Sequence, residues 1–281
     1  MTQKMMILGC GYVGRALAHF WTGCGIEVTA TTTQEENLSY IQPYATHAEV
    51  LEGSDAETLT KLVEGQEVIV VMVAAKGRDD YTHAYQETAK ALNQALAPNS
   101  TVRQIVYTGS TSVYGDCNGD WVTEERSLNP SNAQTKALAE AENLLNQLKS
   151  KQRKVCIFRL GEIVGPDRGP VKRLKNRSGK PFPGDGKNFT NLVHLDDIVS
   201  AVDFAVRNEL DGTFNLCNDL HLSRKEVYEV LCSQLNEPPV QWEGSGGSIH
   251  AGNKRVDSTK IRDQGFVFVR EGFNALLTPP S

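Results

Sequence analysis

The chain has 281 residues, of which 40% are hydrophobic and 22% charged. This composition is typical of a folded globular protein and argues against a largely disordered chain. Its length suits one large α/β domain with a smaller appendage, or two small domains. The formal net charge of -5, from 29 basic and 34 acidic side chains, argues against a nucleic-acid partner, because such proteins usually carry a basic surplus.

The six cysteines are scattered without a CxxC pair, and no histidine cluster has metal-ligand spacing. We therefore expect neither a disulfide scaffold nor a metal site. The chain enters its first predicted strand by Met5, which leaves no room for a signal peptide, and no apolar stretch reaches about 18 residues. These features predict a cytoplasmic protein with no membrane partner.

The first predicted elements enclose a glycine-rich turn. Residues 5–8 form an apolar run typical of a buried strand, and apolar residues at helical spacing predict a helix over residues 12–21. The GxGxxG sequence between them has one glycine for the tight bend, one that lets a pyrophosphate approach, and one that lets helix and strand close up. The helix N-terminus offers N–H groups to phosphate. We therefore expect a dinucleotide cofactor to bind at Gly9, Gly11, Tyr12, Val13 and Gly14. The alternative is a glycine-rich turn kept only for packing.

The end of the next predicted strand, over residues 26–31, bears on the choice between NAD and NADP. An acidic residue about 20 positions beyond the glycines holds the ribose 2′-hydroxyl of NAD and would repel the 2′-phosphate of NADP. Here that position is Thr32, within a run of three threonines, and the first acid is Glu35. The hydroxyls favour NADP over NAD, although this loop contains no Arg or Lys to pair with a phosphate. The alternative is that the threonines only reflect β-propensity.

Strands and helices go on alternating along the chain. The run at residues 68–73 is apolar throughout, as a strand covered on both faces requires. The alternation predicts a doubly wound parallel sheet with right-handed helical crossovers. We predict further strands over residues 48–51, 104–108, 154–160 and 213–216, helices over residues 56–63, 81–96 and 198–206, and one helix that carries Lys136.

The pattern changes after residue 165. Residues 1–165 form the predicted dinucleotide-binding Rossmann domain, to which residues 191–218 return. Residues 166–190 are rich in Gly, Pro, Lys and Arg and predict a long loop. Its basic run is either a solvated surface or a contact for an anionic substrate. Together with residues 219–281, this loop forms the predicted small, mixed α/β substrate cap.

Residues 107–116 read Tyr-Thr-Gly-Ser-Thr-Ser-Val-Tyr-Gly-Asp. This run resembles the strand-end signature of the extended short-chain dehydrogenase/reductases, the NAD-dependent epimerase/dehydratase superfamily. Together with the Asn-Leu-Val-His run that begins at Asn191 and the short C-terminal part, it is most similar to the bacterial YeeZ-type branch. The resemblance covers nearly the whole chain, through the Lys136 helix, Arg159-Leu160-Gly161, Gly165-Pro166, residues 191–197 and residues 214–217.

The resemblance implies roles for particular residues. A family serine at the position of Ser110 hydrogen-bonds the reacting oxygen of the substrate, and a tyrosine four residues before the lysine moves its proton. The lysine, here Lys136, lowers the pKa of the tyrosine and holds the nicotinamide ribose of NAD or NADP. Ala74 and Leu160, near the carboxyl ends of two predicted strands, are added to the cofactor contacts.

The chain departs from the family at the tyrosine, because that position holds Asn132. An asparagine does not titrate, so it can position a substrate or a water but cannot take a proton. Its alternative role is an N-cap of the helix, a common use of asparagine. Positions 132 and 136 share one helix face, and the ribose-binding role of Lys136 survives the loss of the tyrosine.

Other side chains are weaker candidates for the missing donor. By the resemblance, Tyr114 belongs to a loop near the substrate and is not the donor, and Tyr81 and Tyr85 are expected to pack or face solvent. Lys76 follows a strand at the carboxyl edge of the sheet, where ligands bind, and is a candidate acid. His194 titrates at a useful pH, but the acids beside it favour a structural turn that opens a helix.

Two functions follow from these features. The first is an NAD(P)-dependent oxidoreductase or epimerase that acts on a small carbonyl, hydroxyl or sugar-like substrate with a substitute donor or a water. The second is a non-catalytic protein that senses NADP(H). The family also implies a homodimer that pairs residues 81–96 with the Lys136 helix.

Overall fold

The chain divides into two compact units. The computed structural model describes residues 3–96, 100–177, 180–244 and 252–277, so parts of the predicted cap lie outside the described residues. The first unit comprises Met1–Val113, Pro130–Arg159 and Ala201–Phe214, and the second comprises Tyr114–Asn129, Leu160–Ser200 and Asn215–Ser281. Among the described helices, none is long and apolar enough to cross a membrane.

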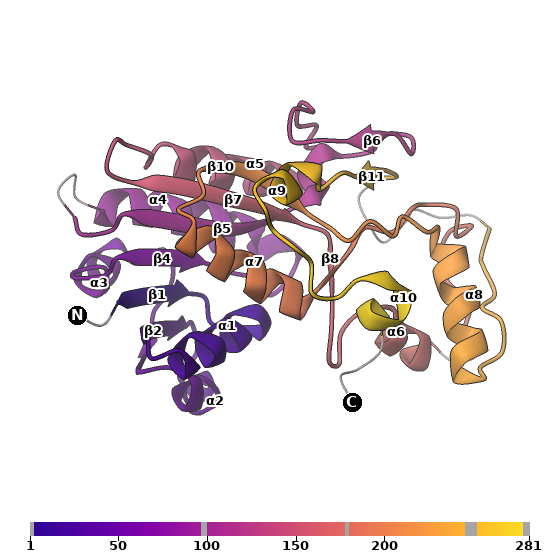
Figure 1. Ribbon diagram of the computed structural model, residues 1–281, viewed down its shortest axis with the longest axis horizontal. Coiled ribbons are helices and arrows are strands. Elements are labelled where there is room, and N and C mark those ends of the chain that lie inside the picture. Colours follow the sequence, from indigo (N-terminus) through magenta and orange to yellow (C-terminus); the bar gives the residue numbers. More distant parts are fainter. Residues whose placement is uncertain (1–2, 97–99, 178–179, 245–251, 278–281) are drawn as a thin grey trace. The chain divides into compact units, whose positions relative to one another are not determined.

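Within the described residues, seven strands form one sheet in the order β10-β7-β5-β4-β1-β2-β3. Neighbouring strands from β3 through β5 run parallel, with Met5 of β1 opposite both Val28 of β2 and Val68 of β4 (Figure 1). The chain order reverses at β1 and β4, and ligands of such sheets bind beside the carboxyl ends of the strands at this switch point. The strands are β1 (Lys4–Leu8), β2 (Glu27–Thr32), β3 (His47–Val50), β4 (Val68–Val71), β5 (Gln104–Ser110), β7 (Lys154–Leu160) and β10 (Gly212–Leu216).

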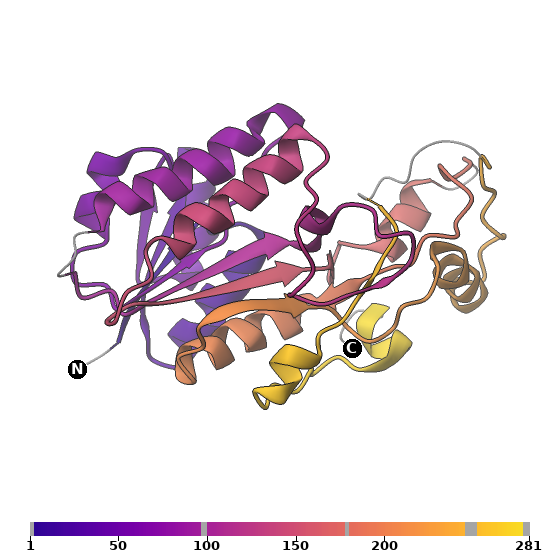
Figure 2. The same cartoon turned by 90° about the horizontal axis from the view of Figure 1, so that it is seen from above.

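The sheet is apolar on both faces, which confirms the predicted doubly wound arrangement. Met6 and Leu8 of β1 belong to a buried cluster that includes residues of the helices α3, α4 and α5. Met5 and Ile7 are equally buried, and they point to the other face because side chains alternate along a strand. Figure 2 shows α4 and α5, in purple and magenta, side by side on one face of the sheet. The helices are α1 (Tyr12–Gly23), α2 (Leu38–Ile41), α3 (Ala56–Leu62), α4 (Thr88–Ala95), α5 (Ala133–Asn146) and α7 (Leu195–Arg207).

The predicted helix over residues 81–96 is not a regular α-helix. A single 3₁₀ turn, Arg78–Asp80, precedes it, and Thr82–Glu87 forms a π-helical segment that runs into α4. Apolar spacing alone does not distinguish a π-turn from an α-turn, so the sequence did not show it. Such segments are rare and frequently occur at functional sites.

The second unit corrects the expectation of a long loop over residues 166–190. Pro170–Asn176 forms the helix α6, which starts with proline at its first position, where the missing N–H costs nothing. Leu174 of α6 packs in a buried cluster with Phe182, Val227 and Tyr228. The other elements are β6 (Trp121–Val122), β8 (Glu162–Val164), β9 (Leu192–His194), β11 (Arg255–Val256), α8 (Arg224–Leu235), α9 (Thr259–Asp263) and α10 (Gly272–Leu277).

Candidate functional site

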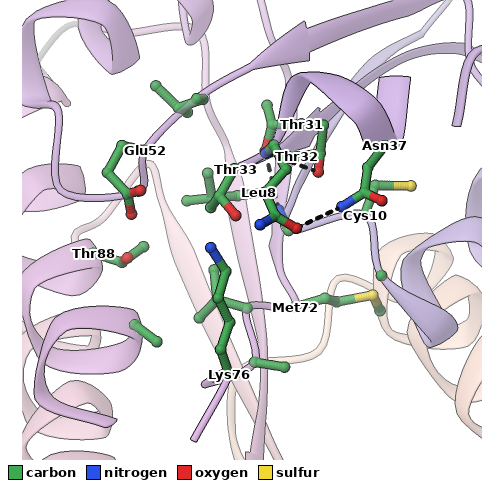
Figure 3. A pocket seen from close by; sticks show the side chains of 18 of the residues that line it. Leu8, Cys10, Thr31, Thr32, Thr33, Asn37, Glu52, Met72, Lys76 and Thr88 are labelled. Atoms are coloured by element: carbon green, nitrogen blue, oxygen red, sulfur yellow. Dashed lines mark hydrogen bonds between the residues drawn. The ribbon is translucent and has the colours of Figure 1, made fainter. Parts of the chain in front are cut away.

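A cavity of about 520 Å³ lies at the carboxyl ends of β1, β2 and β4 in the first unit (Figure 3). This is the switch point of the sheet, where a dinucleotide is expected to bind. Five predicted cofactor residues line the cavity: Gly9, Gly11, Tyr12, Thr32 and Ala74. The other four, which are Val13, Gly14, Lys136 and Leu160, are not among the lining residues that the structure describes.

Two glycines of the turn are required by the backbone itself. Gly9 has φ of +90°, and a Cβ there would lie 2.8 Å from the Cα and N of Val73. A Cβ on Gly14 would lie 3.0 Å from the carbonyl oxygen of Gly9 and 3.2 Å from the side chain of Ile7. These contacts explain why the start of α1 closes against β1 and β4 only with glycine at these positions.

Gly11 is different, because no neighbouring atom of the described protein would contact a side chain there. A Cβ at this position would meet no atom within 4 Å, and φ of −85° lies outside the left-handed region. Gly11 is also the N-cap of α1, has no capping side chain, and is followed by a first turn without an acidic residue. The backbone at this position therefore leaves room for a ligand, and a helix N-terminus of this kind suits a pyrophosphate.

The turn adds no negative charge of its own. Burial raises the pKa of the Cys10 thiol to about 12, so the thiol stays neutral at physiological pH. A neutral side chain leaves the partial positive charge of the α1 N-terminus available to an anion.

Thr31 and Thr32 end β2, Thr33 follows it, and all three line the cavity. Thr31 is buried, and its hydroxyl accepts the N–H of Gly9 (3.1 Å) and donates to the carbonyl of Ile7 (3.4 Å). Thr32 and Thr33 line the cavity beside Gln34 and Asn37. Among the described lining residues, this segment contributes hydroxyl and amide groups but no carboxylate.

Charged groups reach the cavity from other elements. Arg15 comes from the first turns of α1 and Lys76 from the segment after β4. Glu52 Oε1 lies 3.0 Å from Nε2 of His83, which belongs to the π-helical segment. Asp80 Oδ2 accepts the backbone N–H of Lys76 (2.8 Å). Both carboxylates of the cavity therefore already have a partner.

Ser110, at the end of β5, is half-buried, and its Oγ accepts the N–H of Ser112 (3.2 Å). This bond uses a lone pair and leaves the hydroxyl proton available to a substrate oxygen. Lys136 is exposed on α5, and its ammonium forms no hydrogen bond or ion pair with the residues that the structure describes. Both groups are thus available for the roles that the family resemblance implies.

Asn132 is the N-cap of α5. Its Oδ1 accepts the N–H of Thr135 (2.9 Å), and Thr135 Oγ1 accepts the N–H of Asn132 (3.2 Å), which completes a capping box. Its backbone is extended, with φ of −140° and ψ of 172°. The side-chain oxygen is therefore engaged in holding the helix end.

The helix that carries Lys136 is fixed to the sheet by a buried ion pair. Arg159 of β7 donates to Glu142 of α5 from Nε (3.1 Å to both oxygens) and Nη2 (2.7 Å), and both side chains are nearly inaccessible. Burial raises the pKa of Glu142, and the Arg159 guanidinium opposes that rise. At Gly109, next to Ser110, a Cβ would lie 2.9 Å from Tyr107 and 3.4 Å from Glu142 Oε1. The close approach fixes α5 against β5 beside Ser110.

The other candidate donors have structural roles. The hydroxyl of Tyr114 is buried and donates to Asn215 Oδ1 (2.7 Å). His194 is buried, and its Nδ1 accepts the N–H of Asp196 (3.1 Å) at the start of α7. The rings of Tyr81 and Tyr85 pack against each other with centroids 5.3 Å apart. Among these groups, only Lys76 lines the cavity.

Comparison of the whole sequence with known proteins identifies its family. The model of the NAD dependent epimerase/dehydratase family matches residues 5–217. The chain belongs to this family. Protein YeeZ of Escherichia coli K12 is 30% identical over an alignment of 268 residues, and the match covers 92% of this chain and 93% of YeeZ. The resemblance inferred from the sequence motifs, including the YeeZ-type branch, is confirmed.

Solved structures of epimerase/dehydratase proteins share the fold. The dTDP-glucose 4,6-dehydratase of Bacillus anthracis in complex with NAD has a TM-score of 0.83 at 18% identity, covering 98% of this chain and 94% of that one. MoeE5 in complex with UDP-glucose and NAD has a TM-score of 0.79 at 20% identity, covering 98% and 96%. At these identities the likeness shows the Rossmann fold alone.

The cavity of this epimerase/dehydratase chain suits a nicotinamide dinucleotide. Gly11 provides an approach that a side chain would obstruct, and the α1 N-terminus and two cations provide positive charge. Several lining residues were not found from the sequence, among them Arg15, Glu52 and His83. The position of Arg15 directly after Gly14 was a usable signal, whereas the pairing of Glu52 with His83 joins segments that no local pattern connects. No group of three or more described His, Cys, Asp or Glu residues is placed to hold a metal ion.

Proposed function

We propose that this protein binds NADP(H) in the cavity at the β1–β4 switch point and is an oxidoreductase or epimerase for a small carbonyl, hydroxyl or sugar-like substrate. The observation that carries the proposal is Gly11, where a side chain would contact no atom of the described protein and would enter the cavity at the head of α1. The threonine hydroxyls, and the lack of a carboxylate among the described cavity-lining residues from Thr31 to Asn37, support NADP(H) over NAD(H).

The residues have separate roles in this proposal. When bound, the nicotinamide supplies hydride exchange with the substrate. Ser110 donates its hydroxyl proton to the reacting oxygen of the substrate, and Lys136 holds the nicotinamide ribose. Asn132 holds the end of α5 and does not transfer a proton, so the proton moves through a water or through another side chain.

A second function is favoured by a specific observation. The side chain at the usual tyrosine position is engaged in the capping box, and the hydroxyl of Tyr114 is engaged by Asn215. Because both groups are held in hydrogen bonds within the protein, these contacts fit a non-catalytic protein that senses NADP(H) as well as they fit an enzyme. The homodimer implied by the family stays a prediction, and a mass measurement in solution tests it.

One experiment separates these functions. Binding of NADPH, NADP⁺, NADH and NAD⁺ is measured by thermal shift and cofactor fluorescence, and cofactor oxidation is then followed with panels of carbonyls and sugars. Turnover of any substrate supports the enzyme. Equal affinity for both redox forms without turnover supports the sensor, and failure to bind any dinucleotide contradicts both.

The glycine turn supplies a matched pair of variants. We expect Gly11→Ala to fold normally but to weaken dinucleotide binding by about tenfold or more, because its Cβ enters only the cavity. Gly9→Ala is the control, and we expect it to lower the melting temperature because its Cβ meets the backbone of Val73. Unchanged binding by the Gly11 variant would contradict the placement of the cofactor.

A further inference from the structure

The cavity poses a charge problem for the proposed cofactor. A 2′-phosphate carries a charge of about −1.5 to −2 near neutral pH, and moving it out of water requires a cation or several donors. Thr32 and Thr33 offer hydroxyls at the end of β2, but the segment from Thr31 to Gln34 contains no Arg or Lys. A cation that pairs with the phosphate would therefore come from a different element.

Lys76 is placed to do this. Lys76 lies in the segment that follows β4, and β4 neighbours β1 in the sheet. It lines the same cavity as Thr32 and Thr33. In Figure 3 its side chain extends into the cavity toward the side where Thr33 lies. The segment is held by its backbone, because Asp80 accepts the N–H of Lys76 (2.8 Å).

The ammonium of Lys76 has no protein partner within the described part of the chain. It forms no hydrogen bond or ion pair there, although two carboxylates line the same cavity. Asp80 is engaged by the backbone of Lys76, and Glu52 by His83 at 3.0 Å. A cation that leaves nearby acids to other partners is available to an anionic ligand.

We infer that Lys76 determines specificity for the adenosine 2′-phosphate, so that NADP(H) is selected from the β4 side of the cavity, with Thr32 and Thr33 completing the phosphate site. This inference rests on the proposed cofactor site and names the residue that reads the phosphate. Arg15 is a second cation on the cavity wall. It lies in the first turn of α1, beside the expected pyrophosphate position, so we expect it to contribute equally to binding of NAD(H) and NADP(H).

The probes for this inference differ by a single phosphate. Affinities of 2′,5′-ADP and 5′-AMP, and of NADPH and NADH, are measured by titration calorimetry for the wild type and for Lys76→Gln, Lys76→Arg and Arg15→Gln. Lys61→Gln is the matched control, because Lys61 is exposed on α3 and pairs with Glu57 (3.0 Å) outside the cavity.

We expect Lys76→Gln to weaken NADPH and 2′,5′-ADP by about tenfold to a hundredfold, the effect of one charge-assisted hydrogen bond. Affinities for NADH and 5′-AMP should stay within about twofold, since only the phosphate contact is lost. Lys76→Arg should retain the preference for NADPH, because the charge remains, and Lys61→Gln should change nothing.

Other outcomes separate this inference from the proposed function. If the wild type binds NADH as tightly as NADPH, the cofactor site stands but the role of Lys76 is overturned. Loss of the preference in Arg15→Gln but not in Lys76→Gln would also overturn it. Failure of the wild type to bind any of these dinucleotides removes the proposed function itself.

Discussion

The side chain of Asn132, at the position where the family has a tyrosine, caps the N-terminus of α5. The residue at this position therefore has a structural role in this chain. Oδ1 accepts the N–H of Thr135 at 2.9 Å, and Thr135 returns a bond to the backbone. Substitution at this position therefore alters the helix that carries Lys136 as well as the chemistry of the side chain. Activity measurements on variants of Asn132 need a measurement of stability beside them.

We expect Asn132→Ala to lower the free energy of unfolding by about 1 kcal/mol, because an N-cap acceptor is lost. Urea unfolding checks this, and Asn132→Asp, which keeps the acceptor, should stay close to the wild type. If Asn132→Tyr creates carbonyl reductase activity that Asn132→Phe does not, the remaining site is competent and lacks only the phenol. An Asn132→Ala variant with the same free energy of unfolding as the wild type would contradict the capping role.

At the scale of the element, α5 joins two parts of the candidate site. Its first turns carry Lys136, and Glu142, farther along the helix, is held by Arg159 of β7 in a buried ion pair. The close approach at Gly109 brings the same helix against β5, whose last residue is Ser110. The register between Ser110 and Lys136 thus depends on groups that touch neither substrate nor cofactor.

We expect Arg159→Leu to destabilise the protein by about 3 to 5 kcal/mol, since it leaves the Glu142 carboxylate buried without its charged partner. The double variant Glu142→Met with Arg159→Leu should recover a large part of this loss, because an apolar pair replaces the unpaired charge. Urea unfolding of the wild type, both single variants and the double variant measures the coupling. Additive losses would show that the two side chains act independently.

At the scale of the whole molecule, the parallel sheet and the phosphate turn could be predicted because each has a local signature. The run from Val68 is apolar throughout, and the glycines stand between a strand and a helix. The helix α6 was missed because it is short and basic, and of its residues only Pro170 and Leu174 are buried. β6 and β11 are two-residue strands that pair Trp121 with Arg255 across the sequence, and no local pattern reveals such a pairing.

The candidate site was predictable to the same degree. The residues named from motifs, such as Gly9 and Thr32, belong to two short segments at the ends of β1 and β2, and both segments line one cavity. The roles of Lys76 and Asn132 depend on which neighbours engage the surrounding groups, and only coordinates give those contacts. The sequence does not identify the proton donor for the same reason. A hydroxyl such as that of Tyr114 is engaged in a hydrogen bond with a residue far away in the chain, Asn215.

The stability of the whole molecule should depend on pH through two histidines, the buried His194 and the half-buried His221. Burial lowers the pKa of His194, and Arg270 adds to this effect while Asp196 opposes it. Its Nδ1 accepts the N–H of Asp196, and Nε2 has no hydrogen-bond partner among the described atoms, so protonation costs the bond and places a charge in the interior. Burial lowers the pKa of His221 as well.

Because the folded pKa lies below the unfolded value of about 6.5, the unfolded chain binds the proton more readily. The contribution of these histidines to the free energy of unfolding is therefore complete above about pH 6.5. It falls as the pH decreases, by up to about 1.4 kcal/mol per pH unit for each histidine, until the folded pKa is reached. We expect His194→Gln, whose side-chain oxygen can accept the Asp196 N–H, to have a shallower slope in urea unfolding across this range. His19→Gln, at an exposed histidine that forms no ion pair with the described residues, should keep the wild-type slope, and equal slopes in all three proteins would show that His194 does not contribute.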